Sequence, residues 1–520
     1  MSGFVVQLTA PNGRKYSQPI GLFINNKFVS SKSGERIAKR ALSNEEEIIS
    51  VYAAGADDVD IAVKAARRAL NHPSWKFLPA TDRGNLMLAL ADLIDQHKEV
   101  LATIETWDNG NSLCLAFVYL LTFPSLGKPY NASLEDDLNE VINTIKYFAG
   151  WADKVHGQTV GTTSAKLAYT LRRPVGVVGQ IIPWNFPLAM AAMKLAPALA
   201  CGNTVILKPA EQTPLSILYL ANLIRDAGFP PGVINILNGY GKVAGSALVT
   251  HPDVDKIAFT GSTSTGKEVM KMAAGTLKDI ILETGGKSPL IVFQDADLQQ
   301  AVKWAHIGVM YNQGQVCTAT SRILVHNPVY EPFVALFKTM VASKYDKVGD
   351  PFAGDTFQGP QVSRAQYERV LSFIESGKSE GATLVAGGEP IKSTSDGNGF
   401  YIAPTIFTNV TDSMRIYREE VFGPLVVISS FATEEEAIIR ANDTQYGLGA
   451  AIFSKNIERA HRVAAEIEAG TIWINSSNDS DFRVAFGGLK QSGIGYELGQ
   501  AGVEAYSQIK AIHVNLGAKL

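Results

Sequence analysis

The chain has 520 residues, and its 47 basic and 50 acidic side chains give a formal net charge of −3, which argues against general nucleic-acid binding. Its composition is 46% hydrophobic and 19% charged, with 46 glycines and 23 prolines, which excludes collagen-like, low-complexity and fully disordered proteins. Three cysteines are too few for a disulfide framework, so we expect a reducing compartment.

Two amphipathic helices are predicted near the start, over residues 58–70 and 82–107, because leucine, isoleucine and alanine recur every three or four positions. The uncharged run 113–126 is too short to span a bilayer, so no transmembrane segment is expected. From about residue 175, short β-branched runs alternate with helical segments. Strands are expected over 175–182, 204–208, 233–237 and 256–260, and helices over 187–200, 214–228 and 243–250. This alternation predicts an α/β fold with a doubly wound parallel sheet.

A second α/β series begins near residue 288 and predicts a second domain. Its apolar runs lie at 289–293, 318–325, 405–410, 424–431 and 471–477. Residues 155–174 are predicted to form a hairpin and residues 506–515 a final strand, and both have the propensity for pairing or oligomer-forming edge strands. A chain of this length exceeds what one hydrophobic core supports, so about two or three domains are expected.

Two glycine-rich loops resemble nucleotide-binding motifs without matching them. Residues 239–245 follow a strand, but their third glycine comes one residue late for the dinucleotide motif. Residues 261–267 look like a phosphate loop, yet Glu268 stands where a Walker loop needs a hydroxyl for magnesium, which argues against a phosphate-loop NTPase. A glycine turn that enters a helix still suits a pyrophosphate, because free amides and the helix dipole favour anions. The alternative is a turn with no ligand.

The cysteines differ in their surroundings. Cys201 lies in an apolar segment and is expected in the core, whereas Cys317 lies in the polar NQGQVCT and suits an exposed reactive thiol. A lone cysteine is more often buried and inert, so the assignment depends on other polar segments. These contain Glu283 in ETGGKSP, Asn185 in PWNFP, and Lys208 with Glu211 in KPAE. Asn185 and Lys208 come after predicted strands, at the carboxyl edge where α/β proteins bind ligands.

Several motifs in one order make the chain resemble the NAD(P)-dependent aldehyde dehydrogenase superfamily, in its hydrolytic branch. They are PWNFPL, KPAEQTPLS, FTGST, LETGGKSP, NQGQVCTATSR, EEVFGP and FGGLKQSG, within a resemblance that runs from about Phe23 to Gly517. The resemblance implies a Rossmann-like cofactor domain of residues 1–154 and 175–284, an α/β catalytic domain of residues 285–490, and a small β oligomerisation element of residues 155–174 and 498–520. Thr284 departs from the leucine that is usual in the family.

The resemblance implies roles for three residues and no metal site. Cys317 would attack an aldehyde carbonyl as a thiolate, and the Asn185 amide with the Cys317 N–H would form the oxyanion hole of the thiohemiacetal. Hydride transfer to the nicotinamide would leave a thioester, and Glu283 would activate the water that releases a carboxylic acid. Relatives that form acyl-CoA products lack this glutamate.

A nicotinamide cofactor is also implied by the resemblance. The residues that match its binding site are Ile181, Ile182, Trp184, Lys208, Glu211, Thr260, Gly261, Ser262, Glu420 and Phe422. Lys208 and Glu211 match the contacts to the adenine ribose, and a carboxylate beside the 2′-hydroxyl would repel a 2′-phosphate, which favours NAD over NADP. Some family members with this glutamate use both cofactors. The alternative for Lys208 and Glu211 is a surface ion pair.

The resemblance is weakest at the substrate pocket. The matching positions are Phe186, Met190, Met193, Val316, Thr318, Ser480 and Phe486. Met193 and Ser480 stand where relatives often carry bulky aromatic residues, and the loop 476–483 is unusually polar. We therefore expect a wide, less aromatic entrance that admits longer or polar aldehydes. The alternative is that this loop is only solvent-exposed.

Residues 111–127 interrupt a segment that reads WDNGKPY in relatives. The stretch 111–126 has no charged residue, where roughly three are expected for an average composition, and an exposed apolar loop is unfavourable in a soluble protein. Glycine at both borders is compatible with splice signals, so one hypothesis is a translated intron. The alternative is a genuine surface insertion, and cDNA sequencing separates the two.

By resemblance, the protein is expected to form a homotetramer or homodimer and to act on a small-molecule aldehyde, without nucleic-acid or membrane partners. The final residues Ala518, Lys519 and Leu520 resemble a peroxisomal address, but the cytoplasm is the first expectation. A rival hypothesis is a catalytically idle family member with a structural or binding role. The intact catalytic residues argue against it.

Overall fold

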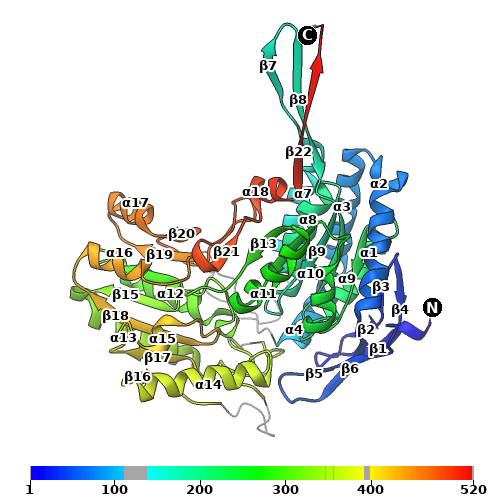
Figure 1. Cartoon of the computed structure of the whole chain (residues 1–520). Coiled ribbons are helices and arrows are strands. Elements are labelled where there is room, and N and C mark those ends of the chain that lie inside the picture. Colours follow the sequence, from blue (N-terminus) through cyan, green and yellow to red (C-terminus); the bar gives the residue numbers. More distant parts are fainter. Residues whose placement is uncertain (1, 111–136, 346, 355, 392–398, 518–520) are drawn as a thin grey trace.

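The structure is a computed structural model that describes residues 2–110, 137–345, 347–354, 356–391 and 399–517. Within these ranges, two α/β bodies lie side by side and a narrow three-stranded arm extends from one of them (Figure 1). The proposed insertion 111–127, with Cys114, lies outside the described residues, as does the C-terminal tripeptide 518–520.

The first body is built on an eight-stranded sheet with the order β21-β13-β12-β9-β10-β11-β3-β4. Its parallel strands are β9 (Val177–Ile181), β10 (Thr204–Lys208), β11 (Ile234–Ile236), β12 (Lys256–Thr260) and β13 (Asp279–Glu283). Antiparallel edge strands are β3 (Leu22–Ile24), β4 (Lys27–Val29) and β21 (Gly493–Ile494). The four strands predicted between residues 175 and 260 are confirmed. Strand order reverses between β9 and β12, which creates a ligand-binding switch point at their carboxyl ends.

Helices cover both faces of this sheet. They are α1 (Ala56–Asn71), α2 (Pro73–Lys76), α3 (Ala80–Gln96), α4 (Lys98–Asn109), α7 (Leu138–Ala149), α8 (Pro187–Ala200), α9 (Leu215–Asp226), α10 (Ser246–Thr250) and α11 (Thr263–Ala273). Alternate strand residues enter two cores: Val178 and Val205 pack with α3, α8 and α9, and Val177 and Ile206 with α1, α10 and α11.

The prediction of one helix over residues 82–107 is wrong. α3 and α4 are separate helices that meet at His97, whose backbone leaves the helical region with φ −100° and ψ 10°. The His97 Nδ1 lies 2.9 Å from the Tyr219 hydroxyl on α9. The apolar periodicity continues across the break because both helices pack on the same core.

The second body has a seven-stranded sheet with the order β16-β17-β18-β15-β14-β19-β20. The strands are β14 (Pro289–Val292), β15 (Arg322–His326), β16 (Thr383–Ala386), β17 (Thr405–Thr408), β18 (Leu425–Phe431), β19 (Gly449–Phe453) and β20 (Thr471–Ile474). The helices are α12 (Leu298–Met310), α13 (Tyr330–Tyr345), α14 (Arg364–Ser379), α15 (Arg415–Arg418), α16 (Glu434–Asn442) and α17 (Ile457–Glu466). The five predicted apolar runs correspond to strands, and the sequence reading missed β16 and β19.

The arm consists of β7 (Thr159–Thr163), β8 (Lys166–Pro174) and β22 (Ser507–Asn515). This confirms the predicted hairpin and the predicted final strand, which pair antiparallel along their whole length. The short helix α18 (Gly499–Ala505) leads from the first body into β22. The arm exposes the apolar side chains of Val160, Leu171 and Ile509. Such a surface is compatible with the predicted oligomerisation role of the arm.

A buried ion pair holds an N-terminal hairpin on the first body. The N-terminal strands are β1 (Val5–Thr9), β2 (Lys15–Pro19), β5 (Arg36–Arg40) and β6 (Glu47–Tyr52). Lys39 on β5 places its Nζ 3.2 Å from Asp108 Oδ1 on α4, and the two side chains are 5% and 1% exposed. The other carboxylate oxygen of Asp108 accepts a hydrogen bond from the Leu215 N–H at 2.7 Å.

Replacing Lys39 by methionine should lower the free energy of unfolding by about 3–5 kcal/mol, because it leaves the Asp108 carboxylate buried without its cation. Urea unfolding followed by circular dichroism measures this loss. Lys64→Met is the matched control, since it breaks an exposed pair with Asp60 and should cost less than about 1 kcal/mol. Equal losses in the two variants would contradict this account of the buried pair.

Candidate active site

The carboxyl ends of four neighbouring strands meet at the switch point of the eight-stranded sheet. Ile181 ends β9, Lys208 ends β10, Thr260 ends β12 and Glu283 ends β13. Ile181 pairs in register with Lys208, and Thr260 pairs with Glu283. The fold therefore brings residues expected for cofactor binding to the same edge as the expected general base.

Glu283 is a buried carboxyl group with free acceptor atoms. The residue is 3% exposed, and within the described part of the chain neither of its carboxylate oxygens has a hydrogen-bond partner. Burial raises the pKa of Glu283 well above its ordinary value, and the charge of Glu497 adds to this while that of Lys194 opposes it. A carboxylate with a raised pKa is a better proton acceptor for water near neutral pH.

The two groups that act on Glu283 form a fully buried ion pair. Lys194 Nζ lies 2.6 Å from Glu497 Oε1, and neither side chain is exposed. The sequence analysis did not single out this pair. The sequence did offer a signal for Lys194, because it is the single charged residue of the otherwise apolar α8, PLAMAAMKLAPALA. A buried lysine in such a helix needs an acidic partner.

Cys317 lies in the loop between the short turn Tyr311–Gly314 and β15. In that turn, Asn312 and Gln313 have positive φ values of 47° and 57°, a costly conformation that clusters at functional sites. The Cys317 side chain is partly buried rather than exposed as predicted. Burial, followed by the charges of Glu420 and Glu283, raises the pKa of Cys317 to about 12. The thiol is therefore protonated at neutral pH in the structure as it stands.

Asn185 is held against the same loop. Its Nδ2 donates to the Gln315 carbonyl oxygen at 2.9 Å, two residues before Cys317. Its backbone oxygen accepts hydrogen bonds from the side-chain amides of Asn312 at 3.1 Å and Asn109 at 3.2 Å. A side-chain amide has two N–H groups, so one remains for a further acceptor.

The segment after Glu283 passes against the cysteine loop through two glycines. A Cβ on Gly286 would lie 2.5 Å from the Cys317 carbonyl oxygen, and one on Gly285 would lie 2.3 Å from Glu420 Oε2. A Cβ at Gly286 would clash with backbone, so only glycine permits that approach, whereas a Cβ at Gly285 would displace the Glu420 carboxylate. Glu420 accepts a hydrogen bond from the Gly286 N–H at 3.0 Å, and burial raises the pKa of Glu420 to about 7. The segment Gly285–Gly286 therefore lies between Glu420 and the loop that carries Cys317, and it contacts both.

Lys208 and Glu211 form an ion pair in which the lysine is buried and the glutamate is partly exposed. Lys208 Nζ lies 3.3 Å from Glu211 Oε2, and the side chains are 3% and 31% exposed. The alternative of a surface ion pair therefore fails for Lys208. The Ile182 N–H donates to the Lys208 carbonyl oxygen at 3.1 Å. Nearby in the expected cofactor set, the rings of Trp184 and Phe422 meet edge to face, with centroids 5.3 Å apart.

The loop after β12 is partly occupied by its own hydrogen bonds. Ser262 caps the N-terminus of α11, and its Oγ accepts a hydrogen bond from the Thr265 N–H at 3.3 Å. The Gly261 N–H donates to the Glu283 carbonyl oxygen at 3.0 Å, so this amide is not available for a phosphate. The buried Thr260 Oγ1 has no partner among the described atoms. The hydroxyl of Thr260 is therefore a free polar contact at this edge.

The expected pocket residues come from three segments. Phe186 stacks on Tyr311, with centroids 5.8 Å apart. Phe486 and Glu497 exchange two backbone hydrogen bonds of 2.8 and 2.7 Å. The Thr318 hydroxyl donates to the Asn478 side chain. These contacts tie the pocket segments to the cysteine loop and to the buried ion pair.

The remaining expected pocket residues differ in exposure. Met193 is 7% exposed and belongs to the hydrophobic core around α8, Met190 and Val316 are partly buried, and Ser480 is exposed. Phe482, which the sequence analysis did not select, packs edge to face on Tyr147 with centroids 5.5 Å apart. The loop 476–483 therefore contains an aromatic contact despite its polar sequence.

The departure from the family pattern at Thr284 has a structural role here. The Thr284 hydroxyl donates to the Gln491 carbonyl oxygen at 2.7 Å, and its N–H donates to the Ser492 carbonyl oxygen at 2.9 Å. The Ser492 hydroxyl in turn donates to the Gly285 carbonyl oxygen at 2.7 Å. These bonds fix the segment that follows Glu283 to β21.

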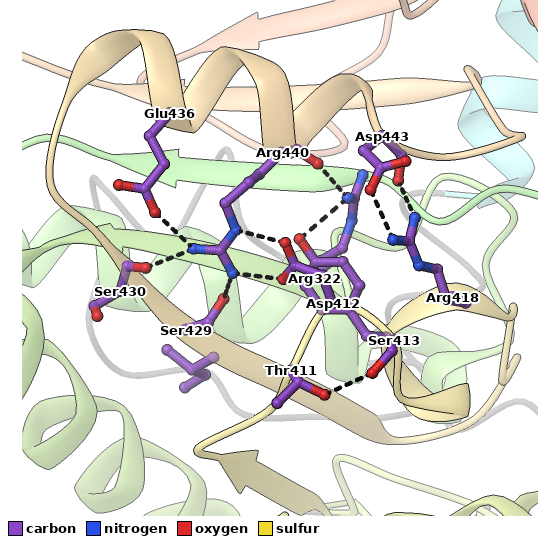
Figure 2. Close-up of polar contacts among 12 residues, drawn as sticks. Arg322, Thr411, Asp412, Ser413, Arg418, Ser429, Ser430, Glu436, Arg440 and Asp443 are labelled. Atoms are coloured by element: carbon purple, nitrogen blue, oxygen red, sulfur yellow. Dashed lines mark hydrogen bonds and ion pairs between the residues drawn. The ribbon is translucent and has the colours of Figure 1, made fainter.

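Arg322 anchors the strand that follows the cysteine loop. It begins β15, it is 1% exposed, and its guanidinium donates at 2.7 Å to the carbonyl oxygens of Arg440 and Ala441, at the carboxyl end of α16. A cation is favoured at this end of a helix. Arg440 itself binds both carboxylate oxygens of Asp412, at 3.0 and 2.8 Å (Figure 2). Sequence analysis missed this support of the site.

Neither a metal-ligand cluster nor a membrane span occurs in the described ranges. No group of three or more histidine, cysteine, aspartate or glutamate side chains there is arranged to hold a metal ion. Likewise, none of the described helices is long and apolar enough to cross a membrane.

Comparison with known proteins places this geometry in context. The model of the Aldehyde dehydrogenase family matches residues 28–123 and 118–512, so the two matched pieces meet inside the uncharged run. An aldehyde dehydrogenase of Aspergillus niger is 48% identical over 521 residues and covers 100% of both chains. A Saccharomyces cerevisiae relative, named as an NAD(P)+ aldehyde dehydrogenase, is 48% identical over 96% of both chains.

Two solved structures are similar over nearly the whole chain. An NAD+ complex of aldehyde dehydrogenase from Bacillus cereus has 46% identity and a TM-score of 0.90, and covers 96% of this chain and 97% of its own. A betaine aldehyde dehydrogenase from Staphylococcus aureus, also solved with NAD+, has 39% identity and a TM-score of 0.91, and covers 97% and 96%. Both fold class and family follow from these matches.

Proposed function

The chain belongs to the aldehyde dehydrogenase family, and from that premise we propose that it oxidises an aldehyde to the carboxylic acid while it reduces NAD. The observation that supports this function is the convergence of Cys317, Asn185 and Glu283. Asn185 is bonded to the loop of Cys317, and the segment after Glu283 touches the Cys317 carbonyl. A nucleophile, an amide donor and a base thus share one site, as acyl-transfer chemistry requires.

In this proposal, Cys317 gives its thiol proton to solvent water, and the thiolate sulfur forms a bond to the aldehyde carbonyl carbon while the carbonyl π electrons move to the oxygen, which gives a thiohemiacetal oxyanion. The free N–H of Asn185 and the Cys317 backbone N–H stabilise the oxyanion. NAD held by the residues at the carboxyl edge, among them Lys208, Glu211 and Thr260, would supply the acceptor for the hydride of the former aldehyde carbon. The resulting thioester on Cys317 is hydrolysed by water, from which Glu283 takes a proton.

NAD fits the residues at the carboxyl edge. Thr260 offers an unpartnered, buried hydroxyl, and Glu211 is 31% exposed beside Lys208, so its carboxylate can accept hydrogen bonds from a ribose 2′-hydroxyl. A 2′-phosphate at the same place would be repelled, which favours NAD over NADP. The name of the yeast relative includes both cofactors, so use of NADP with lower efficiency is part of the proposal.

A panel of aldehydes tests this function. Incubation of the enzyme with NAD and acetaldehyde, benzaldehyde or long-chain aldehydes should increase absorbance of the reduced cofactor, and NADP should give lower kcat/KM values. The proposed wide entrance predicts that longer or polar aldehydes give the higher kcat/KM. Equal values for all aldehydes would contradict the shape preference, and no reduced cofactor with any aldehyde would favour the idle-member hypothesis.

We also propose an assembly and a cellular location for the protein. The exposed apolar residues of the arm, Val160, Leu171 and Ile509, support a homotetramer or homodimer held together through β7, β8 and β22, since an exposed edge favours pairing. The two remaining cysteines are free, which agrees with a reducing compartment such as the cytoplasm. The peroxisome is the second proposed location, on the C-terminal tripeptide alone.

A further inference from the structure

A cavity lies at the edge of the eight-stranded sheet opposite the candidate active site. Its volume is about 710 Å³, within the range of small-molecule sites. It is lined by Gly176 and Asp255, which directly precede β9 and β12, and by Cys201, which follows α8. Because α8 has 14 residues, its ends lie about 20 Å apart, and the candidate active site is at the other end, beside Asn185.

Basic side chains dominate this cavity. Its charged lining residues are Arg67, Lys76, Arg83, Arg172, Arg173, Asp153 and Asp255. Both carboxylates already have partners, since Asp255 lies 2.8 Å from Arg67 and Asp153 lies 2.6 Å from Lys154. Within the described ranges, the other four basic groups form no ion pair. A cavity with this surplus of one charge attracts a ligand of the opposite charge.

The guanidinium groups have unused donors. Arg83, in the first turn of α3, donates to the carbonyl oxygens of Leu78 and Ala200 at 3.3 Å each, and its buried Nε has no partner among the described atoms. Arg172 donates to the Ser507 hydroxyl at 3.1 Å. Each guanidinium has five N–H groups, so most of the donors on Arg83, Arg172 and Arg173 remain for a ligand.

An aromatic ring stands at the rim of the same cavity. Phe77 is 71% exposed, and the Lys76 ammonium lies 5.7 Å from its ring centroid. Trp75, two residues before Phe77, is 2% exposed, and its Nε1 donates a hydrogen bond to the Gly202 carbonyl oxygen at 3.0 Å. An exposed aromatic face next to a basic cluster suits a base that stacks while its phosphates meet the cations.

We propose that this cavity binds a phosphorylated small molecule through Arg83, Arg172 and Arg173, at a site separate from catalysis. Arginine favours phosphate because its planar fork donates two parallel hydrogen bonds to the phosphate oxygens. The shared chemistry is a pyrophosphate group, which inorganic pyrophosphate and a nucleoside diphosphate both carry. Phe77 distinguishes the two, since only the nucleotide has a base to stack.

Titration calorimetry on the full-length, cofactor-free enzyme tests the proposal, because NAD itself carries a pyrophosphate and an adenine base and would compete for the cavity. Wild-type protein should bind inorganic pyrophosphate, and Arg172→Gln/Arg173→Gln should bind it at least about tenfold more weakly. Lys76→Gln, outside the arm, should also weaken binding. Lys303→Gln/Lys338→Gln is the matched control, because it removes two exposed charges on α12 and α13 and should leave the affinity unchanged.

A comparison of ADP with pyrophosphate shows which of the two ligands the cavity favours. ADP that binds more tightly than pyrophosphate, with the difference lost in Phe77→Ala, identifies a nucleotide as the occupant, and equal affinities identify the phosphate group alone. No binding of either ligand to wild-type protein overturns the proposal. It is also overturned if the double arginine variant keeps its affinity and changes only its elution volume in size-exclusion chromatography, because the cavity is then a contact between subunits.

Discussion

Cys317→Ala should show no aldehyde-dependent formation of reduced cofactor, with a loss in kcat of at least about 10⁴-fold. The reason is that both intermediates of the proposed reaction, the thiohemiacetal and the thioester, are covalently bound to this sulfur. Cys201→Ala is the matched control. Cys201 is buried in the core, where its thiol donates to the Val503 carbonyl oxygen at 3.4 Å, so its loss should leave turnover close to wild type.

The same cysteine should respond to pH in a defined direction. Its pKa is raised to about 12, so below that pH the thiolate fraction, and with it the rate of alkylation by iodoacetamide, should rise about tenfold for each pH unit. The measurement uses cofactor-free enzyme in the Cys201→Ala background. A rate that levels off near pH 8 would contradict the raised pKa, and turnover retained by Cys317→Ala would remove the nucleophile from the mechanism.

Glu283→Gln should separate the two halves of the reaction. The first turnover needs no water, so a burst of reduced cofactor should remain, whereas steady-state turnover should fall by about 10²–10⁴-fold because the water is no longer deprotonated. Rapid mixing with a saturating aldehyde measures both phases. The exposed Glu268, which pairs with Lys271 at 2.7 Å, provides the control: Glu268→Gln should keep both phases.

The pH dependence of the slow phase follows from the raised pKa of Glu283. A carboxyl group with a raised pKa is protonated at low pH and cannot accept a proton, so hydrolysis should accelerate as pH rises through that pKa. Glu283→Gln should lose this acceleration. A variant in which the burst and the steady state fall together would instead place Glu283 in the first half-reaction.

Local sequence patterns predicted the fold well and the environment of the site less well. The strands of both sheets follow from runs of β-branched residues, because a central parallel strand is buried on both faces. The break at His97 did not follow, since a contact with Tyr219 from a distant helix accompanies it. In the site, the identity of Cys317 was evident from its neighbours. Its raised pKa comes first from burial and then from the charges of Glu420 and Glu283, and only folding produces that burial and brings those charges close.

Buried ionic groups were the least predictable part. Lys194 and Glu497 form a hydrogen bond although they are 303 positions apart in the sequence, so no short motif contains both residues. The sequence did not indicate the role of Arg322 either. Its hydrogen-bond acceptors are backbone carbonyl oxygens of α16, which lies far along the chain. Backbone acceptors carry no residue signature, so a sequence pattern cannot indicate them.

The end of α4 is hydrogen-bonded to segments of the candidate active site. Gly110, directly after α4, has its carbonyl oxygen bound by the Gln313 side chain at 2.9 Å, and the adjacent Asn109 is bonded to Asn185. Both partners belong to segments that shape the surroundings of Cys317. The last turn of α4 is therefore joined by two side-chain hydrogen bonds to the segments that carry Asn185 and Cys317, so a substitution of Asn109 should be felt at the cysteine loop.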